Sequence, residues 1–61
     1  MRINEKKYNL VMARACKDTK DLAAQGISKT TLTQVGTKNL KPSTVGRIAK
    51  ALGCDVTEII D

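Results

Sequence analysis

The segment from residue 29 to residue 37 gathers side chains that can hydrogen-bond to nucleic-acid bases and phosphates. At about 100° per residue, a helix through this segment places Leu32 and Val35 on one face. The opposite face and its flank then carry Lys29, Thr30, Thr33, Gln34 and Thr37. Solvated helix faces usually mix Glu with Lys, whereas no acidic residue occurs between Asp21 and Asp55. Such a face can hydrogen-bond to base edges and phosphates in a groove. The alternative interpretation is a threonine-rich surface that has no binding function.

A capped helix is predicted immediately before that segment. Asp18 is a natural N-cap, and Asp21 follows three residues later in the pattern of a capping box. A helix is therefore expected from Thr19 to Ala24. Gly26 should end this helix, because glycine readily takes the left-handed conformation of a helix terminus.

The helix that carries the polar face is predicted to follow after a short turn. Ile27 supplies an apolar anchor and Ser28 a second N-cap, so this helix is expected from Lys29 to Val35. Two short helices on either side of one turn, over about residues 18–36, are the signature of a helix-turn-helix.

A longer helix is predicted ahead of these two, from Asn4 or Glu5 to about Cys16. Leu10, Val11 and Cys16 are among the residues expected to turn inward. The cations expected to face water are Lys6, Lys7, Arg14 and Lys17.

A fourth helix is predicted after the polar connection of residues 37–40. Proline suits a first helical turn and serine or threonine can cap it, so the helix is expected to start at residues 41–43 and to end at Gly53. Arg47 and Lys50 lie on its polar side. Its apolar residues recur at three- and four-residue spacing, and they are Val45, Ile48, Ala49 and Leu52.

A last short helix is expected after Asp55, which can serve as its N-cap. Its apolar residues Val56, Ile59 and Ile60 are candidates for a homodimer interface, or else they close the bundle over the neighbouring helices. The predicted fold of residues 1–61 is therefore all-α, one compact bundle of five short helices.

The length and composition of the chain restrict the class of protein. Sixty-one residues make one small domain with no room for a catalytic cavity. Hydrophobic residues form 41% of the chain and aromatic residues 2%, with Tyr8 the only one, so the core must be aliphatic. Without further aromatic side chains on which bases could stack, single-stranded nucleic acid is disfavoured as the target.

The charge of the chain is positive and unevenly distributed. Eleven Lys and Arg against six Asp and Glu give a net charge of +5. Residues 1–41 hold nine cations and three acids, hence +6, whereas residues 42–61 hold two cations and three acids, hence −1. Such a field attracts polyanions, and duplex DNA carries about one charge per 1.7 Å of axis. A basic composition alone also fits membrane-surface peptides and ribosome-associated proteins.

Other chemistries lack the residues that they need. The sequence holds no histidine, no paired nucleophile and base and no glycine-rich phosphate loop, so neither an enzyme nor a cofactor is predicted. Cys16 and Cys54 cannot complete a four-ligand zinc site, and we interpret both as small buried hydrophobic residues. Arg14 interrupts the first apolar stretch, which excludes a signal peptide or a membrane span there. A cytoplasmic, nucleoid-associated protein without a small-molecule ligand is expected.

Two stretches of the chain resemble the helix-turn-helix regulators of the phage-repressor and Cro type, often called the Xre family. They read GISKTTL, at residues 26–32, and KPSTVGRIAKALGCDVTEII, at residues 41–60. The resemblance covers about residues 10–60 and implies a lambda-repressor-like domain whose third helix enters the major groove. Two departures from the family pattern are a turn one residue shorter before Gly26 and the exit from the third helix at residues 36–39.

The resemblance also implies which residues contact DNA. Carried over by position, Lys29, Thr30 and Gln34 read bases, with Thr33 as a further contact. The implied phosphate contacts or caps are Thr19, Ser28, Thr37, Lys38, Asn39 and Lys41.

The predicted function is therefore double-stranded DNA binding by a transcriptional regulator, with repression as the expected mode. A domain of this size reads few base pairs, so a palindromic operator and a homodimer are expected. The alternative is a helical protein-interaction module, antitoxin-like or anti-repressor-like, that keeps the scaffold without reading DNA. It would need an exposed apolar patch on the helix at residues 29–35, where the sequence is polar and cationic.

Overall fold

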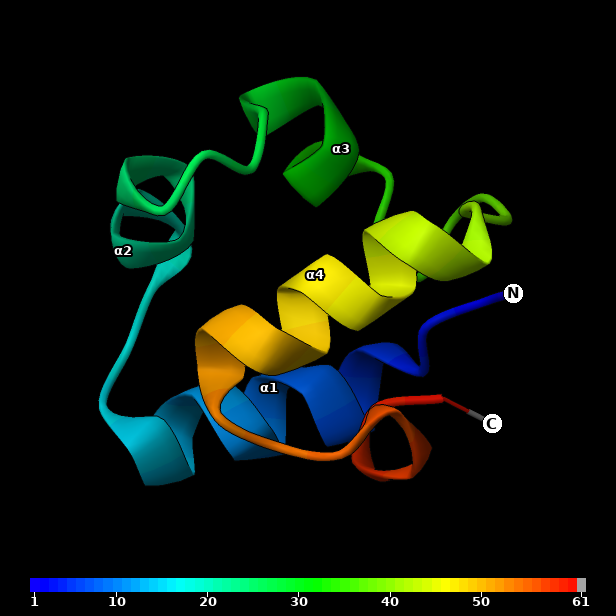
Figure 1. The fold of residues 1–61 in the computed structure, drawn as a ribbon. Coiled ribbons are helices and arrows are strands. Elements are labelled where there is room, and N and C mark those ends of the chain that lie inside the picture. The colour runs from blue at the N-terminus through cyan, green and yellow to red at the C-terminus, as the bar shows by residue number, and fades with distance from the viewer. Residues whose placement is uncertain (61) are drawn as a thin grey trace.

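The computed structural model describes residues 1–60 and consists of four α-helices and one 3-10 helix. The elements are α1 (Glu5–Ala15), α2 (Thr19–Ala24), α3 (Lys29–Thr33), α4 (Pro42–Leu52) and the 3-10 helix η1 (Val56–Glu58). α4 contacts α1, α2 and η1, and α2 contacts α3. In Figure 1, α3 and η1 lie on opposite sides of the neighbouring helices α1 and α4. The predicted all-α class is confirmed.

Three helices, α1, α2 and α4, have close to their predicted bounds. Asp18 and Asp21 form the predicted capping box of α2, in which the Asp18 carboxylate accepts from the Lys20 and Asp21 N–H groups. The Asp21 carboxylate in turn accepts from the Asp18 N–H at 2.9 Å. α1 begins after Asn4, whose side chain caps it, and α4 ends at Gly53 in the left-handed conformation.

α3 is shorter than predicted. It ends at Thr33, Gln34 is its C-cap, and the chain continues in turns through Thr37. Gly36 has a φ of 81°, and the Thr37 N–H bonds back to the Gln34 carbonyl at 3.1 Å. Threonine also lowers helix propensity, because a branched Cβ loses side-chain freedom in a helix. Val35 therefore lies beyond the helix, yet it is buried as predicted.

The last of the five predicted short helices is the single-turn 3-10 helix η1, so the structure has four α-helices and not five. Asp55 caps it as predicted, in a capping box. Ile59 and Ile60 then leave the helix, and the Asn4 N–H donates to the Ile59 carbonyl at 2.7 Å. This long-range bond satisfies a backbone group at the point where the helix stops.

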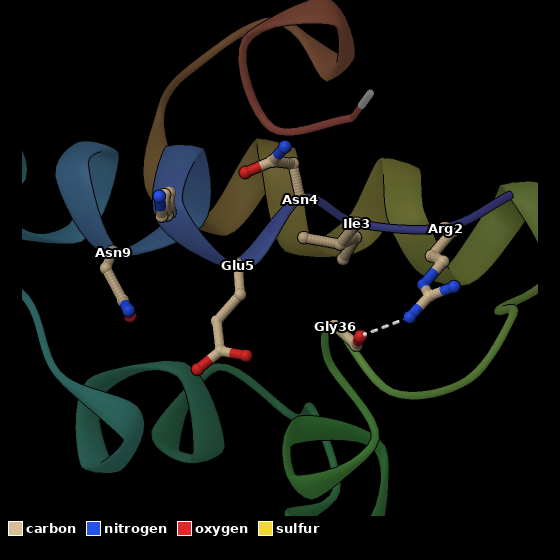
Figure 2. A pocket seen from close by; sticks show the side chains of 7 residues that line it. Arg2, Ile3, Asn4, Glu5, Asn9 and Gly36 are labelled. Atoms are coloured by element: carbon tan, nitrogen blue, oxygen red, sulfur yellow. Dashed lines mark hydrogen bonds between the residues drawn. The ribbon is translucent and has the colours of Figure 1, made fainter.

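The N-terminal segment joins regions that are distant in the sequence. Ile3 is buried and forms an isolated antiparallel bridge with Ile60. Arg2 Nη2 donates to the Gly36 carbonyl at 3.0 Å, so this segment lies between the C-terminal residues and the loop after α3 (Figure 2). Contacts of this kind leave no periodic pattern, and the sequence analysis did not predict them.

The inward face of α1 differs from the prediction at two positions. Val11 is buried as predicted, together with Tyr8, but Leu10 is 70% exposed and Cys16 is exposed. Tyr8 and Val11 are three residues apart and define the buried face, whereas Leu10 is turned about 100° from Val11 and about 160° from Tyr8. Cys16 is the C-cap of α1, with a φ of 55°, and lies past the buried part of the helix.

Two further corrections concern polar residues. Lys17, which was predicted to face water, is half-buried and donates from Nζ to the Ala51 carbonyl at 2.6 Å. α4 begins at Pro42 with Lys41 as its N-cap and without a side-chain cap. Ser43 lies inside the helix, so the predicted serine or threonine cap is wrong.

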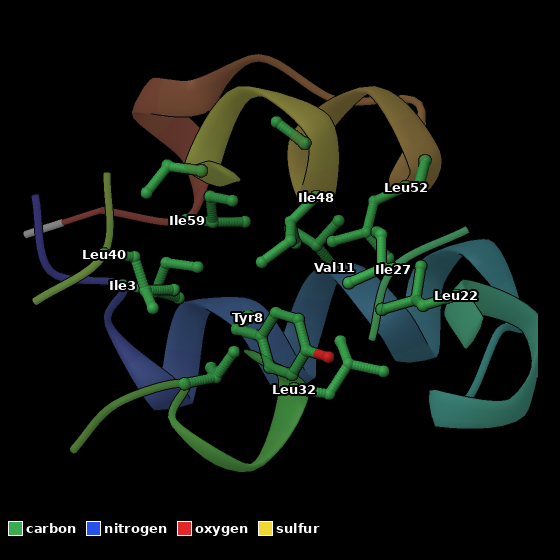
Figure 3. Close-up of a cluster of buried hydrophobic side chains, with 14 residues drawn as sticks. Ile3, Tyr8, Val11, Leu22, Ile27, Leu32, Leu40, Ile48, Leu52 and Ile59 are labelled. Carbon is green, nitrogen blue, oxygen red and sulfur yellow. The ribbon is translucent and has the colours of Figure 1, made fainter. Parts of the chain in front are cut away.

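The core is aliphatic apart from the ring of Tyr8 (Figure 3). The Tyr8 hydroxyl is buried and has no hydrogen-bond partner among residues 1–60. Ile59 is fully buried, and Val56 and Ile60 pack against this core. The expectation that these three residues close the bundle is confirmed, which leaves Ile59 unavailable to a homodimer interface. The predicted inward residues of α4 are also buried, and they are Val45, Ile48, Ala49 and Leu52.

Candidate nucleic-acid interface

The turn between α2 and α3 sets the direction of α3. Gly26 takes a φ of 95°, and the buried side chain of Ile27 follows at once. Ser28 is the predicted N-cap of α3, since its Oγ accepts from the Thr31 N–H at 3.1 Å. Leu32 is buried on the inner face of α3. The opposite face of this helix therefore lies at the edge of the molecule (Figure 1).

Three of the four predicted base-reading side chains make no hydrogen bond within the described part of the chain. Lys29 and Thr30 are exposed, and Gln34 is half-buried. They lie at the start of α3 and at its C-cap, one turn later. Their amine, hydroxyl and amide groups are therefore available to an external partner.

The other hydroxyls near α3 are used inside the molecule. Thr33 Oγ1 donates to the Thr30 carbonyl at 2.7 Å, and Thr37 Oγ1 donates to the Gln34 carbonyl at 3.1 Å. Ser28 is engaged as the N-cap. These three residues thus have structural roles, and their contacts with DNA stay predictions.

A depression of about 460 Å³ separates the start of α2 from α3. Its lining residues are Thr19, Lys20, Lys29, Leu32 and Thr33. The fold thus brings Thr19, a predicted phosphate contact, beside two of the predicted base-reading residues. Lys20 was not among the predicted site residues, although its place next to Thr19 in the first turn of α2 could have indicated it.

The loop from α3 to α4 holds the remaining predicted phosphate contacts. All three are exposed, and they are Lys38, Asn39 and Lys41. The N-terminal segment supports this loop through the bond from Arg2 to Gly36 and through a bond of 2.7 Å from the Leu40 N–H to the Met1 carbonyl. Arg2 therefore adds a cation beside the exit of α3, which the sequence analysis missed because only the fold brings it there.

The lysines around α3 form no ion pair within the described residues. The only ion pair among residues 1–60 joins Arg14 and Glu58 at 2.7 Å, on the side of α1 and η1. The nearest preceding carboxylates in the sequence, Asp18 and Asp21, are held in the capping box of α2. Glu5 lies beside Gly36 at the exit of α3, whereas no described carboxylate lines the depression at its start, so lysines dominate the field there, which favours a polyanionic partner.

Two further features of the described residues concern metal binding and the cysteine thiols. No group of three His, Cys, Asp or Glu side chains within residues 1–60 could hold a metal ion. Cys16 and Cys54 are free thiols, and burial raises the pKa of the Cys54 thiol, which keeps it protonated near neutral pH.

None of the helices within residues 1–60 has the length and apolar character needed to cross a bilayer.

Comparisons with protein-family models, curated proteins and solved structures found no match to the chain. The function of this protein has to follow from its own residues.

Proposed function

We propose that this protein binds duplex DNA sequence-specifically and regulates transcription, with α3 in the major groove. The observation that carries the proposal is the outer face of α3, where Lys29, Thr30 and Gln34 present hydrogen-bonding groups that residues 1–60 leave unused. Leu32 and Val35 anchor the opposite side in the core. A lambda-repressor-like architecture and repression as the mode of regulation belong to the same proposal.

Lysines on α2 and in the loop after α3 supply the sequence-independent part of binding. They form charged contacts with phosphates and release counterions, so affinity falls as salt rises. At about −0.9 per neutralised phosphate, four or five contacts give a slope of about −4 in log K against log salt. The groups assigned to this part are Thr19, Lys20, Lys38, Asn39 and Lys41.

Side chains on α3 supply the discrimination between bases. Gln34 can pair bidentately with adenine, Lys29 can reach O6 and N7 of guanine, and the Thr30 hydroxyl can donate or accept. Each good pair contributes about 1–3 kcal/mol of discrimination. Half-burial of Gln34 restricts its rotamers, which favours one fixed orientation of its amide.

The proposal includes the binding of two copies of the protein to one palindromic operator. The longest extent of the described chain is 24 Å, which is less than the helical repeat of about 34 Å between equivalent major-groove positions. Two copies on adjacent half-sites are therefore neighbours on one side of the duplex.

The proposal is tested by selecting bound sequences from a pool of random duplexes. A shared motif is expected for the unmodified protein, and Gln34→Ala should relax the preference at one position of it. Lys38→Ala should weaken binding to all duplexes alike and lower the salt slope by about 1. Equal effects of both substitutions on specific and random duplexes would contradict the division into reading and holding residues.

Failure to enrich any motif would overturn the DNA-binding proposal and favour the protein-interaction module. The surface of α3 does not favour that module, because the large exposed hydrophobic residues of the described chain are Met1 and Leu10. Neither of them lies on α3.

A further inference from the structure

The depression between α2 and α3 has an apolar floor and a cationic rim. Leu32, 8% exposed, is its one aliphatic lining residue, and Lys20 and Lys29 supply its charges. No carboxylate lines it within residues 1–60. The larger depression beside Gly36, of about 600 Å³, differs because Glu5 lies in its wall (Figure 2).

Thr33 lines the depression, and its hydroxyl has no hydrogen left to donate, so its methyl group is the part that can make an apolar contact with a partner. Its hydroxyl hydrogen is used in the 2.7 Å bond to the Thr30 carbonyl. Thr30 has the opposite character, since its exposed hydroxyl has no partner among the described residues. α3 therefore carries two adjacent strips, a polar strip with Thr30 and Gln34 and a strip with Leu32 and Thr33 that is apolar between the two lysines.

We infer that this depression is a subsite for the C5-methyl group of a thymine in duplex DNA. The inference rests on the proposed function. In the major groove thymine is the base that presents a methyl group, and contact with a threonine methyl is favourable. Any other base at this position would instead turn a polar edge toward Leu32 and give up the apolar contact, which is unfavourable.

The two lysines explain why the occupant is a base within a duplex rather than a free apolar ligand. Lys20 on α2 and Lys29 on α3 both line the depression, so one can contact a phosphate and the other a neighbouring base. A polyanion satisfies both cations, whereas an uncharged apolar ligand leaves them unpaired. The occupant therefore combines a methyl group with a charged backbone, as thymine in DNA does.

The test replaces each thymine of the selected operator by uracil, which removes one methyl group and nothing else. For the unmodified protein, one position in each half-site should lose roughly fourfold in affinity, the change that corresponds to burying about one methyl group. The other thymines should tolerate uracil. Equal affinity for every uracil-substituted duplex, with sequence-specific binding intact, overturns the subsite and leaves the proposed function standing.

Two variants at Thr33 separate its methyl from its hydroxyl. Thr33→Ser keeps the bond to the Thr30 carbonyl and should bind the thymine and uracil duplexes equally. Thr33→Val keeps a methyl group and should retain the roughly fourfold preference for thymine. The reverse result, with the preference kept by serine and lost by valine, would assign the reading to the hydroxyl and overturn the inference.

Thr57→Ser is the matched control. Thr57 is exposed on η1, and its hydroxyl also makes an internal bond, to Asp55 at 3.0 Å. This variant should keep both the affinity and the preference for thymine. If no variant and no unmodified protein binds a specific duplex, the proposed function falls and the subsite with it.

Discussion

The outer face of α3 and the corner between α1 and η1 differ in whether their charged side chains are paired. On α3, Lys29 is exposed and forms no ion pair within the described chain. At the corner, Arg14 Nη2 lies 2.7 Å from Glu58 Oε1, and the other Glu58 oxygen accepts from the Asp55 N–H at 3.0 Å. The same types of residue are therefore paired at one site and left free at the other.

The titration of the corner reflects this pairing. Hydrogen bonds from Thr57, first from its N–H and then from its hydroxyl, lower the pKa of Asp55. The hydrogen bond from Arg14, followed by that from the Asp55 N–H, lowers the pKa of Glu58. The charges of Arg14 and Glu58 are paired within the chain, whereas the lysines around α3 form no ion pair among the described residues.

The largest expected effect on DNA binding comes from reversing one charge in each region, Lys29 on α3 and Arg14 at the corner between α1 and η1. Lys29→Glu and Arg14→Glu each change the net charge by −2, from +5 to +3. Lys29→Glu should weaken binding of the selected duplex roughly 100-fold, since it loses a base contact and adds repulsion. Arg14→Glu should change affinity less than about threefold. Fluorescence anisotropy at fixed salt measures both, and equal losses would show that only net charge matters.

The capping box of α2 gives the next largest effect. Asp18→Ala removes the acceptor for the Lys20 and Asp21 N–H groups, so the free energy of unfolding should fall by about 1 kcal/mol. Asp18→Asn is the control, because asparagine caps as well as aspartate and removes only the charge. Urea unfolding followed by circular dichroism measures both variants. A loss of equal size in Asp18→Asn would assign the effect to the charge.

Lowering the pH should reduce stability through Asp55 and Glu58, at the corner between α1 and η1, and not through residues of α3. The lowered pKa values of Asp55 and Glu58 mean that their stabilising contribution is present above the ordinary carboxyl values of about 4. It is lost as the pH falls from there through the lowered values in the folded state. Glu58→Gln should therefore flatten the acid limb of stability against pH. An unchanged limb in thermal melts between about pH 5 and 2 would mean that other carboxylates set it.

The smallest effect is expected in the core that lies beneath both regions. The Tyr8 hydroxyl is buried without a partner in the described chain, so Tyr8→Phe should leave stability unchanged or raise it by up to about 1 kcal/mol. Burial raises the pKa of Tyr8, so the tyrosine protein should also lose stability as the pH rises above about 10. The phenylalanine variant should lack this alkaline loss. Clear destabilisation of the variant at pH 7 would indicate that the hydroxyl has a partner in solution.

Local signals predicted several helix ends but not the end of α3, and they predicted the buried face of α4 but not that of α1. The N-caps Asp18 and Ser28 and the terminal Gly53 act through backbone groups within a few residues, so the sequence contains all that they need. Leu10 and Cys16 were placed inside because they are apolar, yet burial depends on which face the neighbouring helices cover. α3 was predicted too long because the turn at residues 34–37 competes with the helix.

The candidate site was predicted in part for the same reason. The exposure of Lys29 and Thr30 follows from the period of one helix, and it is confirmed. Lys20 and Arg2 were missed, because α2 and the N-terminal segment reach the site only through contacts across the fold. The roles of all these residues toward DNA stay predictions.

By itself, the order of residues determined the all-α class, the caps, the turn at Gly26 and the polar outer face of α3, since each of these depends on interactions within a few residues. Only the tertiary structure decided which charges are paired. Arg14 and Glu58 meet through the contact of α1 with η1, and Thr19 and Thr33 come to line one depression through the contact of α2 with α3. The physical reason is that pairing requires side chains within a few ångströms, and chain folding brings together groups whose separation in the sequence carries no such information.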